Sequence, residues 1–140
     1  MSISVEKGNM RMGNSVQDLV ANARTTIQNL SVTEVAEALA TGGVTLVDLR
    51  EPAEVTRDGA IENAVFAPRG MLEFYADPAS SYHRSEFDPE ARVILYCASG
   101  GRSALAGRTL QELGYTDVSH LDGGLKAWIA AGRPISGASA

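Results

Sequence analysis

The stretch VILYCASGGRS, residues 93–103, decides the fold of this chain. Its apolar start, residues 93–96, is typical of a buried strand, and a helical pattern runs from Ser103 to Leu113. The tight Gly-containing loop between strand and helix surrounds the sulfur of Cys97 with backbone N–H groups, at the positive end of a helix dipole. This setting favours a thiolate over a thiol, and a thiolate held by amide donors can attack sulfur, phosphorus or arsenic.

Composition narrows the classes of protein. The 140 residues fit one domain with its own core, and the net charge of −5 argues against nucleic acid as the main partner. We find no apolar run of about twenty residues and no secretory pattern at the start, so neither a membrane span nor export is expected. A single cysteine points to a reduced, cytoplasmic setting. One cysteine and two distant histidines lack metal-ligand spacing, and we expect neither a metal nor another cofactor.

Short apolar strands alternate with helical patterns along the rest of the chain. We predict strands over residues 44–48, 64–67 and 118–121, and helices from Ser15, from the capping box Ser31-Val32-Thr33-Glu34, and over residues 125–131. The first helix carries its apolar residues on one face: Val16, Leu19, Val20, Ala23 and Ile27. Residues 71–90 are interpreted as a polar surface excursion that overhangs the site.

This alternation predicts an α/β fold built from parallel β-α units, with helices on both faces of the sheet. In such sheets ligands bind beyond the carboxyl ends of the strands. Cys97 follows one such end, and Asp48 and Arg50 follow another. We therefore expect these three side chains to gather at one edge of the sheet.

Three motifs occur in a fixed order: VDLRE (residues 47–51), the CASGGRS loop, and LDGGLKAW (residues 121–128). Together they resemble a rhodanese homology domain over about residues 28 to 135. The resemblance implies a single rhodanese-like α/β domain with a mostly parallel five-stranded sheet, whose fifth strand lies just before Ser31. We accordingly divide the chain into a flexible arm (1–14), an extra helix and lead-in (15–29), the rhodanese-like domain (30–135) and a flexible tail (136–140).

The resemblance also implies roles for individual residues. Cys97 matches the nucleophile that accepts sulfur as a persulfide, and Asp48 and Arg50 match a supporting pair at a strand end. The persulfide-binding loop is matched by Ala98, Ser99, Gly100, Gly101, Arg102 and Ser103. One departure is the segment Asp58-Gly59-Ala60-Ile61, where the family often has Gly-His-Ile; it affects a packing detail rather than the activity.

Loop length helps to choose the chemistry. Four residues separate Cys97 from Arg102, whereas cysteine phosphatases and arsenate reductases of similar fold have five and form a wider cradle for an oxyanion. The sequence therefore favours a sulfurtransferase in which Cys97 takes a sulfane sulfur from a donor and passes it to cyanide, a thiol or a protein cysteine. Arg102 favours an anionic donor such as thiosulfate.

Other functions stay open at this point. A non-enzymatic sulfur carrier or partner-binding module is suggested by the helix near residues 16–27, which could dock to a partner or to a second copy in a homodimer. An arsenate reductase or phosphatase is the third alternative. It would have to turn over with an external thiol, because the chain has no second cysteine.

Several side chains carry two interpretations. Asp48 and Arg50 fit a site or a structural ion pair, and Arg102 fits an anion contact or a clamp on the loop through a carboxylate. Arg69 reaches the cleft or stays solvated. For the other three we favour structural roles: His83 as an exposed loop histidine, His120 as a packed, hydrogen-bonded histidine, and Trp128 as core.

Overall fold

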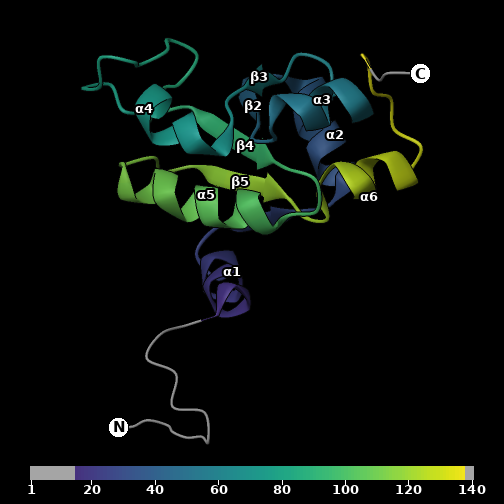
Figure 1. The fold of residues 1–140 in the computed structure, drawn as a ribbon, viewed down its shortest axis with the longest axis horizontal. Coiled ribbons are helices and arrows are strands. Elements are labelled where there is room, and N and C mark those ends of the chain that lie inside the picture. Colours follow the sequence, from purple (N-terminus) through teal and green to yellow (C-terminus); the bar gives the residue numbers. More distant parts are fainter. Residues whose placement is uncertain (1–14, 138–140) are drawn as a thin grey trace, which may run out of the picture.

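The computed structural model of the chain describes residues 15–137, so the predicted arm over residues 1–14 lies outside the described residues. The strands are β1 (Gln28–Leu30), β2 (Val44–Asp48), β3 (Val65–Phe66), β4 (Arg92–Tyr96) and β5 (Val118–Leu121). The helices are α1 (Val16–Arg24), α2 (Val32–Thr41), α3 (Pro52–Asp58), α4 (Leu72–Ala76), α5 (Gly101–Glu112) and α6 (Gly124–Ala130), with a 3-10 turn η1 (Arg69–Met71) before α4. Figure 1 shows their arrangement.

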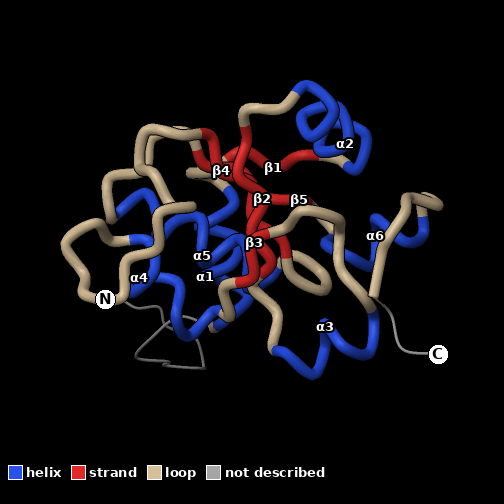
Figure 2. The backbone as a smooth tube through the Cα atoms, turned by 90° about the horizontal axis from the view of Figure 1, so that it is seen from above, coloured by secondary structure: helices blue, strands red, loops and turns tan. Residues whose placement is uncertain are grey.

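The five strands form one sheet in the order β1-β5-β4-β2-β3, and all neighbours are parallel. Helices α1, α4 and α5 cover one face of the sheet, and α2, α3 and α6 cover the other (Figure 2). The predicted parallel sheet with helices on both faces is confirmed, including the short strand before Ser31. Asp48 pairs with Tyr96 and Leu95 with His120, so the strands end at a common edge.

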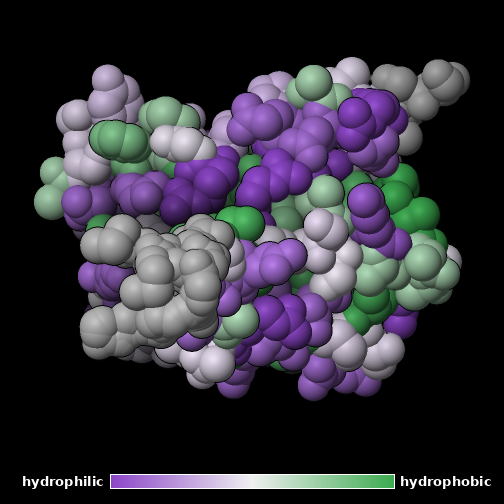
Figure 3. All heavy atoms as spheres, turned by 60° about the horizontal axis from the view of Figure 1, so that its bottom comes forward, coloured by the Kyte–Doolittle hydropathy of each residue, from purple (hydrophilic) through white to green (hydrophobic). Residues whose placement is uncertain are grey.

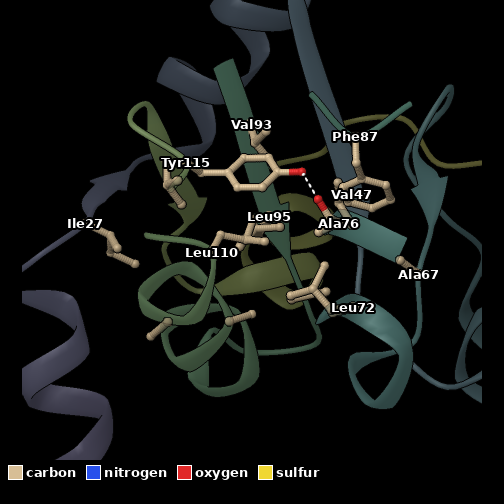
Figure 4. Close-up of a cluster of buried hydrophobic side chains, with 14 of the residues drawn as sticks. Ile27, Val47, Ala67, Leu72, Ala76, Phe87, Val93, Leu95, Leu110 and Tyr115 are labelled. Carbon is tan, nitrogen blue, oxygen red and sulfur yellow. Dashed lines mark hydrogen bonds between the residues drawn. The ribbon is translucent and has the colours of Figure 1, made fainter. Parts of the chain in front are cut away.

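The alternation of β4 side chains divides the core into two layers. Val93 and Leu95 point toward α5 and pack with Leu110 and Tyr115, as Figure 4 shows. Ile94 and Tyr96 point to the opposite face, in the cluster that contains Trp128. Cys97 directly follows Tyr96 and lies on the α5 side of the sheet, because successive strand residues alternate between faces.

The structure corrects the interpretation of residues 71–90. This segment contains α4 and contributes Leu72, Ala76 and Phe87 to the core. The Tyr115 hydroxyl donates a hydrogen bond to the carbonyl of Ala76 at 2.7 Å, which places the segment at the C-terminal end of α5 (Figures 1 and 4). Cys97 lies at the opposite end of this helix of 12 residues, about 18 Å away. The prediction that the segment overhangs the site is therefore wrong.

The two ends of the described chain differ in detail from the sequence predictions. α1 ends at Arg24, so Ile27 lies past the helix. The side chain of Ile27 packs against Gly107, where an added Cβ would lie 3.0 Å from it. Val16 and Leu19 stay 65% and 42% exposed on α1. Ser136, which the sequence assigned to a flexible tail, exchanges backbone hydrogen bonds with Ala60 at 2.9 and 3.0 Å.

Within residues 15–137, no helix has the length and apolar character to cross a membrane.

Candidate active site

The loop after β4 wraps backbone donors around the sulfur of Cys97. The N–H groups of Gly100 and Ser103 lie 3.2 and 3.4 Å from Sγ, and the Cys97 side chain is almost fully buried at 1% exposure. Gly100 adopts φ +112° as the residue before α5, a conformation that side chains rarely tolerate. The sequence predicts that the loop amides from Ala98 to Ser103 stabilise an anionic sulfur, and in the structure the amides of Gly100 and Ser103 are directed at Sγ.

Helix α6 holds the outer side of this loop. The N–H groups of Leu125 and Lys126 donate to the carbonyls of Cys97 and Ala98 at 2.9 and 3.0 Å. The helix can approach so closely because residue 124 is glycine: at φ +64°, a Cβ there would lie 2.6 Å from the Cys97 oxygen and from the Ala98 carbonyl group. Since the loop carbonyls are bound from outside, the loop amides are free to turn inward toward Sγ.

A carboxylate from α3 clamps the end of the loop. The guanidinium of Arg102 donates two hydrogen bonds to Glu54, at 2.8 and 2.9 Å. These bonds lower the pKa of Glu54 to about 2, against a smaller opposing effect of burial. Arg102 therefore acts as a clamp on the loop in this structure, one of the two roles that the sequence left open.

A second ion pair fixes α3 itself. Arg50 is fully buried and forms a two-pronged pair with Asp48 at 3.0 and 2.7 Å, and it also donates to the Gly59 carbonyl at 2.7 Å. The Tyr96 hydroxyl donates to Asp48 at 2.7 Å and accepts from the Ile61 amide at 3.1 Å. Burial, followed by the nearby carboxylate, raises the pKa of Tyr96. With every member hydrogen-bonded, this cluster is a rigid support rather than a reactive centre.

On the α5 side of the sheet, a buried chain of polar groups leads away from the sulfur. The Cys97 Sγ lies 3.6 Å from the Ser103 hydroxyl, which lies 2.8 Å from Nδ1 of His120. The Nε2 of His120 lies 2.8 Å from the side-chain oxygen of Asn29 on β1. Burial lowers the pKa of His120 to about 4, so the imidazole is neutral near pH 7. His120 is thus packed and hydrogen-bonded, but its partner is the site loop.

Two pockets open beside the loop. One, of about 400 Å³, lies between α3 and α6 and is bordered by Ala98, Arg57 and Lys126. The other, of about 700 Å³, lies along α1 and is bordered by Asn29 and Gly101. Seen with the α1 side turned forward, the surface is mostly hydrophilic, and apolar residues gather at the right of the view, where α6 lies in Figure 1 (Figure 3).

Two of the residues that the sequence singled out bond elsewhere. Arg69 donates to Glu73 at 2.8 Å and to Thr109 at 3.3 Å, and Thr109 lies more than a helical turn beyond the loop. His83 bonds to the carbonyl of Phe87 at 3.0 Å in the segment near the far end of α5. Both residues belong to the scaffold. Among residues 15–137, no group of His, Cys, Asp and Glu is arranged to hold a metal ion.

Sequence reasoning missed Glu54 and Asn29. The sequence carries a signal for Glu54, because Glu51 and Glu54 form a capping box around Pro52 and Gly59 ends the helix. That pattern predicts α3 and places Glu54 in its first turn. Asn29 has no comparable signal, because its partner His120 is 91 residues away in the chain.

A parallel α/β domain with a cysteine cradled between a strand and a helix defines the class of protein, and comparison with known proteins names its family. The family of rhodanese-like domains matches residues 31–131, so this chain belongs to that family. A sulfurtransferase of Allochromatium vinosum is 37% identical over 95 residues, which cover 68% of this chain and 80% of the relative.

Two further similarities support the same family. The chloroplastic thiosulfate sulfurtransferase 16 of Arabidopsis thaliana is 34% identical over 76% of this chain and 90% of its own length. A solved structure from Rhodopseudomonas palustris, a protein of unknown function described as a possible tyrosine phosphatase, is similar with a TM-score of 0.84. It is 35% identical, and the similarity covers 91% of this chain and 98% of that one. The predicted rhodanese resemblance is confirmed.

We predict that Gly124→Ala destabilises the protein, because its Cβ would meet backbone atoms of the Cys97 loop at 2.6 Å. Its free energy of unfolding in denaturant should fall by about 2 kcal/mol or more. Gly101→Ala is the matched control, since a Cβ there meets nothing within 4 Å and its φ is not positive. The control should stay within about 1 kcal/mol of the parent. Equal losses in both variants would contradict the close packing of α6 on the loop.

We predict that Glu54→Gln weakens the protein in a pH-dependent way. Because Arg102 lowers the pKa of Glu54 to about 2, the ion pair stabilises the fold fully above the unfolded-state value of 4.5. This contribution is lost as the pH falls toward 2. At pH 7 the variant should lose up to about 1 kcal/mol, since both side chains are partly exposed. The difference between variant and parent should shrink during acid titration; a constant difference would count against the clamp.

Proposed function

We propose that this protein is a sulfurtransferase that carries a sulfane sulfur as a persulfide on Cys97. The observation that carries the proposal is the pair of backbone amides, from Gly100 and Ser103, directed at Sγ. Oriented N–H groups stabilise negative charge on sulfur without a cost of reorganisation during the reaction. The sulfurtransferases among the relatives support the same chemistry.

The reaction has two half-reactions that share this amide cradle. In the first, the Cys97 thiolate attacks the outer sulfur of the donor; a new S–S bond forms, and the donor's own S–S bond breaks. With thiosulfate as donor, sulfite leaves with the bonding electrons. In the second, cyanide or an acceptor thiolate attacks the outer sulfur of the persulfide, and Cys97 leaves as a thiolate. No electrons are exchanged with an external oxidant or reductant.

The position of Arg102 supports sulfur transfer over phosphoryl or arsenate chemistry. A phosphatase of this design needs the arginine of its loop to bind the oxyanion. Here both guanidinium nitrogens that would bind it are bonded to Glu54. The short loop and the occupied arginine both favour a single sulfur atom as the group transferred.

The pocket between α3 and α6 supports an anionic donor such as thiosulfate. It reaches the loop at Ala98, and its wall carries Arg57 and Lys126. The acids on the same wall are already paired, Glu54 with Arg102 and Asp58 with Arg57. The side chain of Lys126 therefore adds positive charge next to the loop, which draws a small anion toward it.

The decisive measurement is the intact mass of the protein after incubation with thiosulfate and then with cyanide. We expect a gain of one sulfur atom that cyanide removes. Cys97→Ser should show no gain, because this chain has no other cysteine. A protein that stays at its original mass with thiosulfate and with protein persulfide donors would refute the proposal, and one that loads sulfur without turnover would be a carrier.

Lys126→Gln tests the donor. We expect the KM for thiosulfate to rise by about threefold to tenfold with a smaller change in kcat, because a surface charge near the loop mainly assists capture of the anion. Arg108→Gln is the control, since Arg108 is an exposed cation on α5 that borders neither pocket. A KM that both substitutions leave equal to that of the parent would argue against an anionic donor in this pocket.

A further inference from the structure

Cys97, Ser103 and His120 are buried together, with side chains exposed by 1% or less. A thiol in this position is largely shielded from bulk water, and a hydrogen-bonded acceptor inside the protein gives its proton a direct path. The proposed sulfur transfer begins with a thiolate and leaves the destination of this proton open. The sole hydroxyl that contacts Sγ in the described part of the chain is that of Ser103, at 3.6 Å.

The hydrogen bonds of Asn29 fix the tautomer of His120. The Asn29 amide nitrogen faces two carbonyls, those of Arg24 at 2.9 Å and Ile27 at 3.4 Å, and carbonyls only accept. The oxygen of the Asn29 side chain therefore faces His120, and Nε2 of the imidazole must donate to it. A neutral imidazole carries one proton, so Nδ1 is the acceptor that faces Ser103.

This tautomer gives the chain of hydrogen bonds a direction. The Ser103 hydroxyl donates to Nδ1 of His120 at 2.8 Å, a shorter contact than its alternative acceptor, the Gly100 carbonyl at 3.2 Å. With its own proton engaged, the Ser103 oxygen presents a lone pair to Sγ and can accept the thiol proton. Every link thus points from the sulfur toward the imidazole.

We propose that His120, oriented by Asn29 and reached through Ser103, takes up the proton that Cys97 releases when its thiol ionises. The S–H bond breaks as the Ser103 oxygen gains that proton, and the original hydroxyl proton of Ser103 moves to Nδ1. The products are a thiolate and an imidazolium, with no change in net charge. Ser103 contacts the reacting sulfur, whereas His120 and Asn29 act through it as positioning residues.

The charged groups around His120 are compatible with this proton transfer. Arg24 on α1 and Asp122 after β5 act on the imidazole with opposite signs, and they are paired with each other at 2.6 and 3.0 Å. Burial lowers the pKa of His120, so the imidazole is neutral near pH 7 and is a weak acceptor on its own. Once the thiolate forms, its negative charge stabilises the imidazolium across Ser103.

His120→Asn separates proton uptake from simple hydrogen bonding, because the Asn oxygen can still accept from Ser103 but cannot take a proton. The rate of alkylation of Cys97 by iodoacetamide, measured against pH on the full chain, reports ionisation of the only cysteine. We expect the pH midpoint to rise by about one unit in His120→Asn, which slows alkylation about tenfold at pH values well below the midpoint of the parent. His83→Asn, the same change at the other histidine, should leave the midpoint where it is.

Asn29→Asp is a second variant, for which we expect the pH midpoint of alkylation to move in the opposite direction. A carboxylate that faces Nε2 stabilises the imidazolium, so the midpoint should fall below that of the parent. In the parent, nitrogen NMR of the imidazole should show Nδ1 of His120 protonated at pH values at which Cys97 is a thiolate, and Cys97→Ser should leave Nδ1 unprotonated at the same pH.

The inference rests on the proposed function only in taking Cys97 as the nucleophile, and none of these readouts uses a sulfur donor. An unshifted midpoint in His120→Asn overturns it, as does a uniform change in alkylation rate at every pH, which indicates a loosened loop. An imidazole that is neutral at every pH at which Cys97 is a thiolate overturns it as well. Failure to load sulfur from any donor would instead refute the sulfurtransferase, with the proton relay intact.

Discussion

The site depends on the hydrogen bonds that bind the Cys97 loop from outside. A tight loop can turn its amides toward a sulfur only if its carbonyls find partners on the other side. The first turn of α6 supplies these partners at Cys97 and Ala98, and Gly124 allows the close approach. The GG pair of the LDGGLKAW motif therefore serves the sulfur site as well as the turn before the helix. Replacing one backbone hydrogen by a methyl group at Gly124 would push the two segments apart.

The two faces of the sheet support this loop through different interactions. On one face, the Asp48–Arg50–Tyr96 cluster holds α3, and α3 extends Glu54 to clamp Arg102. On the other face, Ser103 of α5 links the loop to His120. The ion pairs set the shape of the loop, and the uncharged hydrogen-bonded groups from Ser103 to Asn29 set the hydrogen-bonding environment of the sulfur. Both sets of groups lie at the carboxyl ends of the strands, where parallel sheets commonly bind ligands.

Much of this architecture could be predicted from local patterns. Three signals each act over only a few residues: the apolar run before Cys97, the capping box at Ser31 and the glycines after β5. The strand and the helices that these signals predict are present in the structure. The contacts between distant segments could not be predicted this way. Glu54 reaches Arg102 across 48 positions, and Asn29 reaches His120 across 91. The prediction for residues 71–90 is wrong because Phe87 stands alone among polar neighbours and shows no periodicity, yet it is 1% exposed.

The deep burial of Cys97 constrains the order of events in the proposed transfer. A sulfur atom that is enclosed by its own loop, with its side chain 1% exposed, can be approached by one reactant at a time. Donor and acceptor cannot both contact Sγ at such a centre, so we expect the first product to leave before the acceptor attacks. In the proposed transfer, we therefore expect the protein to alternate between an empty and a loaded form, and steady-state kinetics to take the double-displacement pattern, with parallel lines in reciprocal plots.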